Sequence, residues 1–401
     1  MWMKQGGYSW DGYDRNRVGA AVRTPISRAK RGPFATLYPD QLLVPVLRAL
    51  HERTGINPAA VQDIVVGNVL QPGAGATVAR MAALAAGYPV ETAVAAVNRQ
   101  CSSGLQACAQ IAAAIHAGWI DVGVGAGVES MTKGYGAGAM SETSDEILDI
   151  PQAADCLLPM GTTSENVAKE FRVARSDQDE LAVKSHAKAA HARANGWFKQ
   201  EIVPVPVTVE DKDGTEKRFV VAEDDGIRPG TSMASLAKLK PAFAEDGTTT
   251  AGNASQVSDG AAAVLLMRRS KAKQLGLKPL ATFVTAAVVG VPPRVMGIGP
   301  AFAIPMACKQ AGIRVQDLDV VELNEAFASQ AVYCMRQLGL GEEKVNPCGG
   351  AIALGHPLGC TGARQIATLL PQLHRTKQRW GCVSMCIGTG MGMAAIIRRE
   401  D

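Results

Sequence analysis

The order of features in the first third of this chain returns in its last third, and such an internal duplication strongly constrains the fold. In each copy a Val-Gln-Asp segment opens an apolar run and a Val-Asn pair precedes a later loop. These segments are residues 61–63 and 97–98 in the first copy, and 315–317 and 345–346 in the second. Three echoes in one order, counting the apolar run that closes each copy, predict two similar halves.

Helical and strand-like patterns alternate within the halves. Apolar residues at i, i+3 and i+4 spacing predict a helix over residues 105–115, and a helical period also covers 41–50. Short apolar runs at 64–66, 92–97 and 120–128 are typical of buried strands. The alternation predicts a parallel α/β sheet covered by helices.

A different kind of sequence separates the halves. Residues 133–250 contain a Gly- and Ser-rich segment, a polar helical region at 177–194 and a charged hairpin at 203–221 with an Asp-Gly turn. We interpret them as an inserted loop domain. The apolar run 261–266 then predicts an extra strand of the first half.

The length of 401 residues allows two or three packed units. The first seventeen residues are rich in Gly, Tyr and Trp without a regular period, which indicates an extension. The predicted division is an extension (1–17), a first half (18–132 and 251–272), a loop domain (133–250) and a second half (273–401).

Composition excludes several classes of protein. The net charge is only +4 and the basic residues are scattered, so no nucleic-acid interface is expected. No apolar stretch has the length of a membrane helix, and a protein without a membrane span is expected. The nine cysteines lie in apolar or Gly-rich segments without a secretory leader, which favours free thiols in a reducing compartment.

Cys101 lies where a predicted buried strand gives way to a predicted helix. A thiol at a helix N-terminus ionises more readily because the macrodipole stabilises the thiolate. Free backbone N–H groups there can also bind a developing oxyanion. Cys101 is therefore a candidate nucleophile, with a buried structural cysteine as the alternative.

Two further residues complete a reactive set. His356 lies in a Gly-His-Pro-Leu-Gly loop, which would present an imidazole rather than pack it into a helix. Cys386 ends an apolar run and precedes Gly388, Gly390 and Gly392, where the backbone can approach a ligand closely. A Cys–His pair with a second thiol can carry out nucleophilic and acid–base chemistry.

Two rival interpretations use the same segments. A metal site would draw on Cys348, Cys360, Cys382, Cys386 and His356. The Cys-x3-Cys spacing lacks a second pair, so no metal site is predicted. The glycines after Cys386 have too little chain behind them for a nucleotide-binding βαβ unit, and the absence of a Gly-Lys dipeptide excludes a Walker A loop.

Residues 98–106, 324–327, 355–357 and 386–390 form four motifs that, in this order, resemble those of the thiolases, over a match from about residue 19 to 393. Residues 98–106 resemble the nucleophile motif of the degradative 3-ketoacyl-CoA thiolases, and the other three motifs are similar to 324–327, 355–357 and 386–390. Residues 157–161 and 250–263 are most similar to the peroxisomal branch.

The resemblance implies a thiolase-like α/β fold, with two duplicated αβαβα halves packed face to face and an inserted loop domain. It implies that Cys101 is acylated, that His356 activates it, and that Cys386 moves the α-carbon proton of the second thioester. Asn324 would hold a water that forms one oxyanion hole with His356, and the N–H groups of Cys101 and Gly388 would form the other. The implied coenzyme A contacts are Arg228, Ser235, Ala251, Ser255 and Met160.

The implied activity is that of an acyltransferase, a 3-ketoacyl-CoA thiolase of fatty-acid β-oxidation. It would use coenzyme A as a substrate and need no cofactor. The alternative is an acetoacetyl-CoA thiolase working in the condensing direction, although Gln100, Ser102 and Ser103 favour the degradative branch. A ketoacyl synthase would need a His–His or His–Asn pair in place of Cys386. A non-enzymatic scaffold would normally show a damaged motif.

The resemblance also implies a homodimer, with a tetramer as the alternative. A peroxisomal location is expected from the resemblance only, because the sequence shows neither an N-terminal nor a Ser-Lys-Leu peroxisomal address. Cytoplasm and mitochondrial matrix are the alternatives. The segment before Val18 departs from the family, because Asp14 to Arg17 replace an apolar first strand.

Overall fold

The strands of the first half follow an order that differs from their order in the sequence. A computed structural model describes residues 16–136, 143–210 and 213–401. Across the sheet the first half contributes β4 (Ala93–Val97), β3 (Asp63–Gly67), β5 (Val122–Ser130), β8 (Ser258–Arg268) and β1 (Asn16–Arg23), with β2 (Ser27–Arg28) beside β8. The predicted extra strand of the first half is confirmed, because β8 lies between β5 and β1.

The second half repeats this arrangement. Its strands are β10 (Val320–Leu323), β11 (Trp380–Ile387), β12 (Met391–Arg399) and β9 (Ala281–Gly290), again in spatial order. Val321 of β10 also forms a parallel bridge with Val345, in the position that β4 occupies beside β3. Strand directions agree pair by pair, so the predicted duplication is confirmed.

The sheet is mixed, so the prediction of a parallel sheet was correct for only some of its strand pairs. β3 runs parallel to β4 and β5, but β8 runs antiparallel to both of its neighbours, and β12 does the same in the second half. The β11–β12 connection is a tight turn without a crossover helix, and such a connection can only return the chain antiparallel.

The predicted boundary of the N-terminal extension was also wrong by two residues, because β1 already begins at Asn16. Asn16 and Arg17 are buried despite their polarity. The Asn16 side-chain amide donates to the Ala112 carbonyl at 2.8 Å, and the Arg17 guanidinium lies 3.5 Å from the Glu400 carboxylate. Partnered polar groups therefore replace the apolar start of this strand. Residues 1–15 lie outside the described part of the chain.

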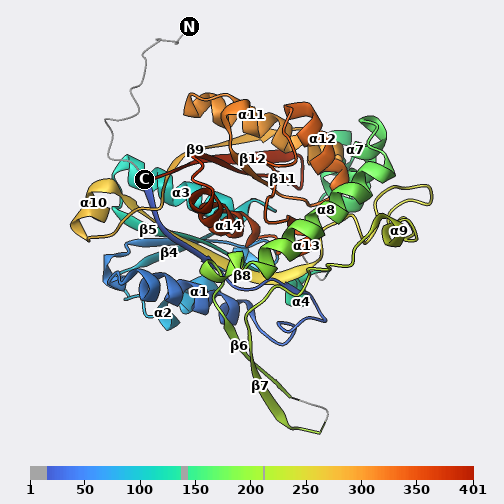
Figure 1. The fold of residues 1–401 in the computed structure, drawn as a ribbon. Helices are drawn as coiled ribbons and strands as arrows, with labels where there is room; N and C mark the ends of the chain where they lie inside the picture. Colours follow the sequence, from blue (N-terminus) through green and yellow to red (C-terminus); the bar gives the residue numbers. More distant parts are fainter. Residues whose placement is uncertain (1–15, 137–142, 211–212) are drawn as a thin grey trace.

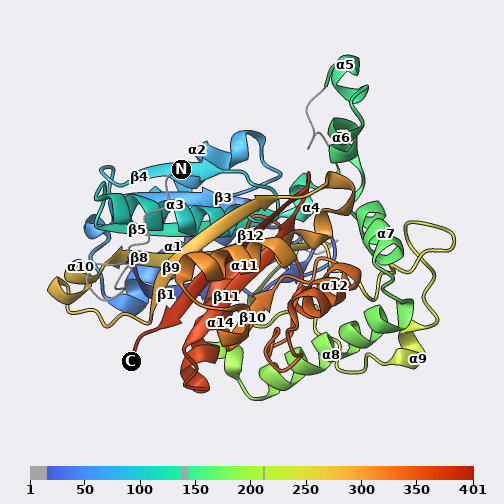
Figure 2. The ribbon, with the colours of Figure 1, turned by 90° about the horizontal axis from the view of Figure 1, so that it is seen from above.

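Helices form three layers around the two halves of the sheet, giving the five layers α-β-α-β-α (Figure 1), which lie over one another when seen from above (Figure 2). The outer layers are α1 (Pro39–Thr54) with α2 (Ala76–Ala85), and α11 (Gly299–Ala311) with α12 (Ala328–Leu338). The central layer is α3 (Ser103–Ala117) with α14 (Thr361–Arg375). Both central helices bury apolar side chains in one cluster with the facing strands, so the helix predicted over 105–115 is confirmed.

The central helices cross at two glycines. A Cβ added to Gly362 would lie 2.3 Å from the backbone nitrogen of Leu105, and one added to Gly104 would lie 2.6 Å from the carbonyl oxygen of Gly359. Only hydrogen atoms fit at this crossing. The N-termini of α3 and α14 therefore meet backbone to backbone, and this contact brings the loops before them together.

We expect Gly362→Ala to destabilise the protein, because the methyl group must displace a neighbouring backbone. The expected loss in the free energy of unfolding is roughly 3 kcal/mol, at the upper end for overpacking. Urea unfolding measures it. Gly290→Ala is the matched control, since a Cβ there meets no atom within 4 Å. Equal stability of the two variants would contradict this packing.

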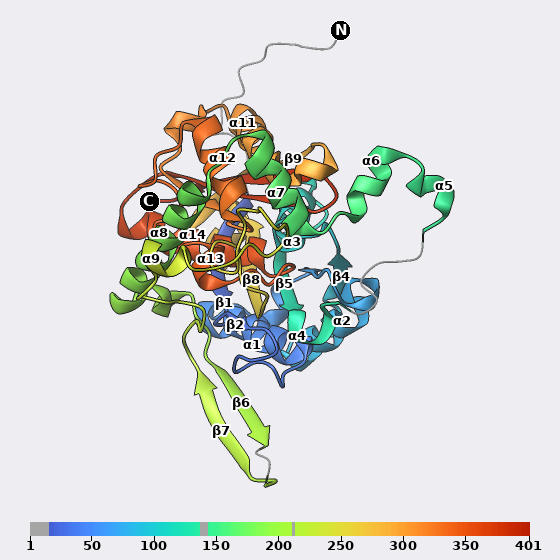
Figure 3. The same cartoon turned by 90° about the vertical axis from the view of Figure 1, so that its right-hand side faces the viewer.

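The remaining elements belong mainly to the region between the halves. They are α4 (Met131–Gly134), α5 (Asp145–Leu148), α6 (Pro151–Ala154), α7 (Met160–Glu170), α8 (Arg175–Ala194), β6 (Val205–Glu210), β7 (Glu216–Val221) and α9 (Met233–Leu236), with α10 (Arg269–Gln274) and α13 (Ala351–Leu354) in the second part of the chain. The predicted polar helix and hairpin are confirmed as α8 and β6–β7, and the hairpin projects away from the layers (Figure 3).

Candidate active site

Cys101 lies in a tight loop between β4 and α3, two residues before the helix begins at Ser103. The Ser103 hydroxyl accepts a hydrogen bond from the backbone of Arg99 at 2.9 Å and donates to the carbonyl of Gln100 at 2.6 Å. Gln100 has a φ of 46°, a conformation that non-glycine residues adopt at an energetic cost. The loop thus holds Cys101 just before the N-terminus of α3, next to the strained backbone of Gln100.

The expectation that Cys101 ionises readily in the free protein was wrong. Burial raises the pKa of its thiol, and the hydrogen bond from the backbone N–H of Gly388 opposes this only in part. Desolvation of the thiolate outweighs the helix terminus. Cys101 is nevertheless half-exposed, as is Cys156, whereas the other seven of the nine free cysteines are buried. Its ionisation therefore requires a base within the site.

His356 lies in the loop between α13 and α14, and both nitrogens of its ring have a hydrogen-bond partner. Its Nδ1 lies 2.6 Å from the hydroxyl of Thr361, which donates in turn to the carbonyl of Pro357 at 3.1 Å. The hydroxyl can accept a hydrogen bond from Nδ1 only if Nδ1 carries the proton. Nε2 is then unprotonated, and its lone pair can accept. The side-chain amide of Asn324 donates to Nε2 at 3.3 Å. His356 is therefore oriented as a base.

Burial lowers the pKa of His356 to about 3, and the nearby Arg364 guanidinium contributes. Burial likewise lowers the pKa of His186 to about 4, with Arg228 contributing. Both imidazoles are neutral in the free protein at neutral pH.

The lowered pKa of His356 makes the free energy of unfolding depend on pH. In the unfolded chain His356 titrates near 6.5, so below that pH the unfolded state binds more protons and the free energy of unfolding falls. Buried acids with raised pKa values act in the opposite direction. We therefore compare His356→Gln with wild type at pH 7.5 and pH 5.0 by urea unfolding. The variant should gain about 2 kcal/mol relative to wild type at the lower pH. An unchanged difference would contradict a buried, neutral His356.

Asn324 follows β10, where its backbone N–H donates to the carbonyl of Ser384 at 2.9 Å. Its side-chain oxygen is buried and has no hydrogen-bond partner among the described residues. A buried acceptor of this kind is where a bound water is expected.

Cys386 lies at the end of β11 and is fully buried in a cluster with Met296 and Ala326, against which Met160 and Phe327 pack. Burial raises the pKa of its thiol well above the usual range, and the interaction with Cys101 raises it further. The two thiols therefore lie close together although 285 residues separate them in the sequence.

The segment after Cys386 reaches both sides of the site. A Cβ on Gly388 would lie 3.5 Å from the Met160 sulfur and 3.9 Å from Cγ of Gln100. The backbone of residue 388 thus lies between the Cys101 loop and the start of α7.

The predicted coenzyme A contacts divide into two groups. Met160 packs against the Cys386 cluster, and the backbone N–H of Ser255 donates to Ala326 of that cluster at 3.0 Å. Arg228, Ser235 and Ala251 are exposed on the region between α8 and β8.

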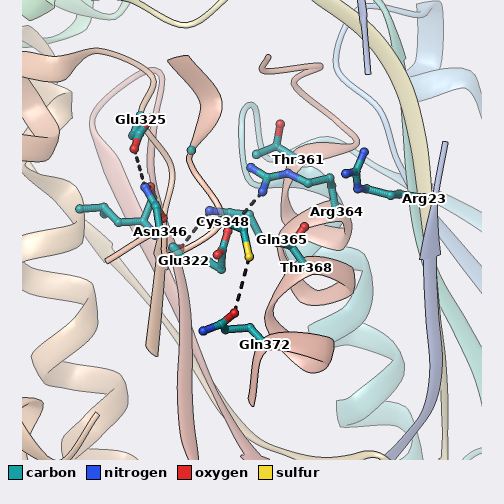
Figure 4. A network of polar contacts seen from close by, with 12 residues as sticks. Arg23, Glu322, Glu325, Asn346, Cys348, Thr361, Arg364, Gln365, Thr368 and Gln372 are labelled. Carbon is teal, nitrogen blue, oxygen red and sulfur yellow. Dashed lines mark hydrogen bonds and ion pairs between the residues drawn. The ribbon is translucent and has the colours of Figure 1, made fainter. Parts of the chain in front are cut away.

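A buried polar network supports the residues next to Asn324 (Figure 4). The carboxylate of Glu325 accepts hydrogen bonds from Asn346 at 2.8 Å and from Ser185 at 2.6 Å. On α14, Arg364 lies 3.2 Å from the Glu322 carboxylate. These contacts fix the end of β10 and the start of α14, and hence Asn324 and His356.

Sequence reasoning missed Thr361 and Glu129. Thr361 lies five residues after His356 and holds its ring. Glu129 interacts with Cys101, and its only signal was a carboxylate directly after the apolar run 120–128.

The described residues can also be examined for membrane-spanning helices and for metal-binding side chains. Within 16–136, 143–210 and 213–401, no helix is long and apolar enough to span a bilayer. The same residues contain no group of three or more His, Cys, Asp or Glu side chains arranged to hold a metal ion.

The chain matches family models over nearly its whole length. Residues 17–270 match the thiolase N-terminal domain and residues 277–399 match the thiolase C-terminal domain. It is 59% identical over 388 residues to the peroxisomal 3-ketoacyl-CoA thiolase 2 of Arabidopsis thaliana, covering 96% of this chain and 84% of that protein. It is 56% identical over 375 residues to the human peroxisomal 3-ketoacyl-CoA thiolase, covering 93% and 88%.

Solved structures of similar proteins have the same fold as this chain. The dimeric peroxisomal thiolase of Saccharomyces cerevisiae superimposes with a TM-score of 0.90 at 48% identity, covering 96% of this chain and 98% of that one. The acetyl-CoA acetyltransferase of Bacillus anthracis superimposes with a TM-score of 0.87 at 38% identity, covering 96% and 99%. The predicted fold of two similar halves in five layers is confirmed, and the chain belongs to the thiolase family.

Proposed function

We propose that this thiolase cleaves 3-ketoacyl-CoA with coenzyme A, giving acetyl-CoA and a shortened acyl-CoA, as an acetyl-CoA C-acyltransferase of fatty-acid β-oxidation. The observation that carries the proposal is the identity of 56–59% to relatives named peroxisomal 3-ketoacyl-CoA thiolases. The identity to the acetyl-CoA acetyltransferase is lower, at 38%. Degradation is therefore favoured over acetoacetyl-CoA formation.

In the first half-reaction Nε2 of His356 takes the proton of the Cys101 thiol. The thiolate attacks the C3 keto carbon, and the C2–C3 bond then breaks with its electron pair leaving as the enolate of acetyl-CoA. Cys386 gives its proton to C2, which completes acetyl-CoA and leaves the shortened acyl group on Cys101.

In the second half-reaction the Cys386 thiolate takes the proton of coenzyme A. The coenzyme A thiolate attacks the acyl group, Cys101 leaves, and the imidazolium of His356 returns the first proton. Each step transfers a proton or an acyl group, so the cycle needs no metal or redox cofactor.

The developing oxyanions need donors in the low-dielectric site. We assign one oxyanion hole to the backbone N–H groups of Cys101 and Gly388. The other consists of His356 and a water held by the unpartnered oxygen of Asn324. The exposed Arg228, Ser235 and Ala251, with Ser255 and Met160 nearer the thiols, are assigned to coenzyme A.

A kinetic series of 3-ketoacyl-CoA chain lengths tests this function. We expect thiolysis of medium and long chains with kcat/KM at least as high as for acetoacetyl-CoA. Turnover confined to acetoacetyl-CoA would favour the short-chain, condensing enzyme instead.

We also propose a homodimer, by analogy with the relative described as dimeric. β4 is an edge strand, and the exposed Met81 and Leu84 lie on the neighbouring α2, with the exposed Val90 just before β4. An edge strand beside exposed apolar side chains favours a second copy there over a monomer. Sedimentation should give twice the 42.0 kDa of the chain. A tetramer is the alternative outcome.

A peroxisomal location is extended from the relatives named peroxisomal. Imaging of a fluorescent fusion tests it against cytoplasm and mitochondrial matrix.

A further inference from the structure

Glu129 is a fully buried carboxylate at the end of β5 that the proposed reaction does not use. Its Oε1 accepts from the Asn68 side-chain amide at 3.1 Å and from the backbone N–H of Leu70 at 3.2 Å. Its Oε2 accepts from the backbone N–H groups of Val69 and Gly359, both at 3.0 Å. One side chain therefore collects four donors.

The four donors come from both halves of the protein. Asn68, Val69 and Leu70 follow β3 of the first half, whereas Gly359 belongs to the loop of the second half that carries His356. Asn68 is itself fixed, since its amide also donates to the carbonyl of Val128 at 2.7 Å. Glu129 thus joins the His356 loop to the half that contains Cys101.

The hydrogen-bond pattern fits an ionised carboxylate. A carboxylate offers about four lone-pair positions and each oxygen of Glu129 accepts two donors, so a proton would have to displace one of them. Burial raises the pKa of Glu129 to about 7, and these donors oppose the rise. All four donors are neutral groups, and no salt bridge to this carboxylate is found within residues 16–136, 143–210 and 213–401.

Two titratable groups interact with this carboxylate, one from each half of the protein. They are the thiols of Cys101, in the loop before α3, and of Cys360, directly before α14, and both interact electrostatically with Glu129. Arg364, Arg23 and Asp224 also act on Cys360. The charge of Glu129 raises the pKa values of Cys101 and Cys360.

We propose that Glu129 is a positioning residue that fixes the His356 loop against the Cys101 half, and that its charge keeps the Cys101 proton inside the site. Loss of that proton to solvent would place a second negative charge near the carboxylate. Transfer to His356 creates a cation together with the thiolate and leaves the net charge unchanged. This role rests on the proposed function, because it assumes that Cys101 and His356 exchange a proton.

Two variants separate the two parts of the role. In Glu129→Gln the charge is lost, and the side-chain NH2 group faces two N–H groups. It cannot accept hydrogen bonds from them because it is itself a donor. In Glu129→Asp the charge stays, but the shorter side chain cannot reach donors on both loops. Both variants should lower kcat by roughly tenfold to hundredfold with little change in KM, because the base is misplaced.

The pH profile of Cys101 alkylation by iodoacetamide distinguishes an electrostatic role from a purely structural one, because a structural role would leave this profile unchanged. Alkylation of the Cys101 peptide is measured by mass spectrometry. For Glu129→Gln the profile should shift to lower pH, with alkylation at pH 7 roughly tenfold faster than in wild type. For Glu129→Asp the profile should not shift in that direction. Asp259→Asn is the matched control, because Asp259 is also a buried acid bound to a backbone N–H, that of Thr132 at 2.9 Å.

A wild-type kcat in Glu129→Gln would overturn the positioning role, and an unshifted alkylation profile would overturn the electrostatic one. If Glu129→Gln does not fold, the Glu129→Asp variant decides, and a wild-type kcat there overturns the proposal. Alkylation is measured without turnover, so it is independent of the proposed reaction. Failure of that reaction would instead appear as an acyl group on a residue other than Cys101.

Discussion

Replacing Cys101 by alanine is expected to lower kcat/KM for thiolysis by at least roughly 10⁴-fold, because no other group can accept the acyl chain. Incubation with a labelled 3-ketoacyl-CoA should leave no label on the protein, whereas the wild-type peptide containing Cys101 should carry one acyl group. The fold should persist, since Cys101 is half-exposed and its removal leaves no large cavity.

Cys156→Ala is the control for this experiment, because Cys156 is the other half-exposed thiol of the nine. It should still form the acyl-enzyme. Labelled protein in the Cys101→Ala variant would remove Cys101 as the nucleophile, and loss of labelling in both variants would point to a general effect of removing a thiol.

Replacing Cys386 by alanine should separate the two kinds of chemistry. The variant should still exchange an acyl group between acyl-CoA and Cys101, because coenzyme A can enter and leave this step as its own thiolate when the Cys386 base is absent. Cleavage of the C2–C3 bond should fall by roughly 10³- to 10⁴-fold, because the leaving enolate finds no acid. The first is measured as label exchange between acyl-CoA and coenzyme A, and the second as thiolysis.

Cys382→Ala controls for the lost volume, because Cys382 is equally buried four residues earlier on β11. It should lower stability while retaining both activities. Equal loss of exchange and cleavage in Cys386→Ala would contradict its role as a separate acid and base.

Much of the fold could be predicted because its signals are local or repeated. The apolar face of residues 105–115 predicts α3, and the echo of residues 97–98 at 345–346 identifies the two halves. Strand direction has no such signal, since an apolar run has the same pattern in either direction, so the antiparallel directions of β8 and β12 could not be predicted. The start of β1 was missed because Arg17 is polar and its ion pair with Glu400, at the other end of the chain, leaves no signal in the local sequence.

The candidate site divides in the same way. Loop composition indicated Cys101, His356 and Cys386 as the reactive residues, and the structure brings the two thiols and the Asn324–His356 pair together. The ionisation of Cys101 was predicted wrongly because burial depends on the facing half, which the local sequence does not contain. The same holds for Glu129, whose partner Gly359 is 230 residues away.

The crossing of α3 and α14 has a consequence for motion. At Gly104 and Gly362 the backbones of the two halves are in direct contact, so a sliding or opening movement of the halves would have to break this close packing. Substrates must therefore arrive and products depart past the segments on the rim, while the frame beneath stays rigid. Crystals of this enzyme should consequently survive soaking with acyl-CoA and turn it over without cracking.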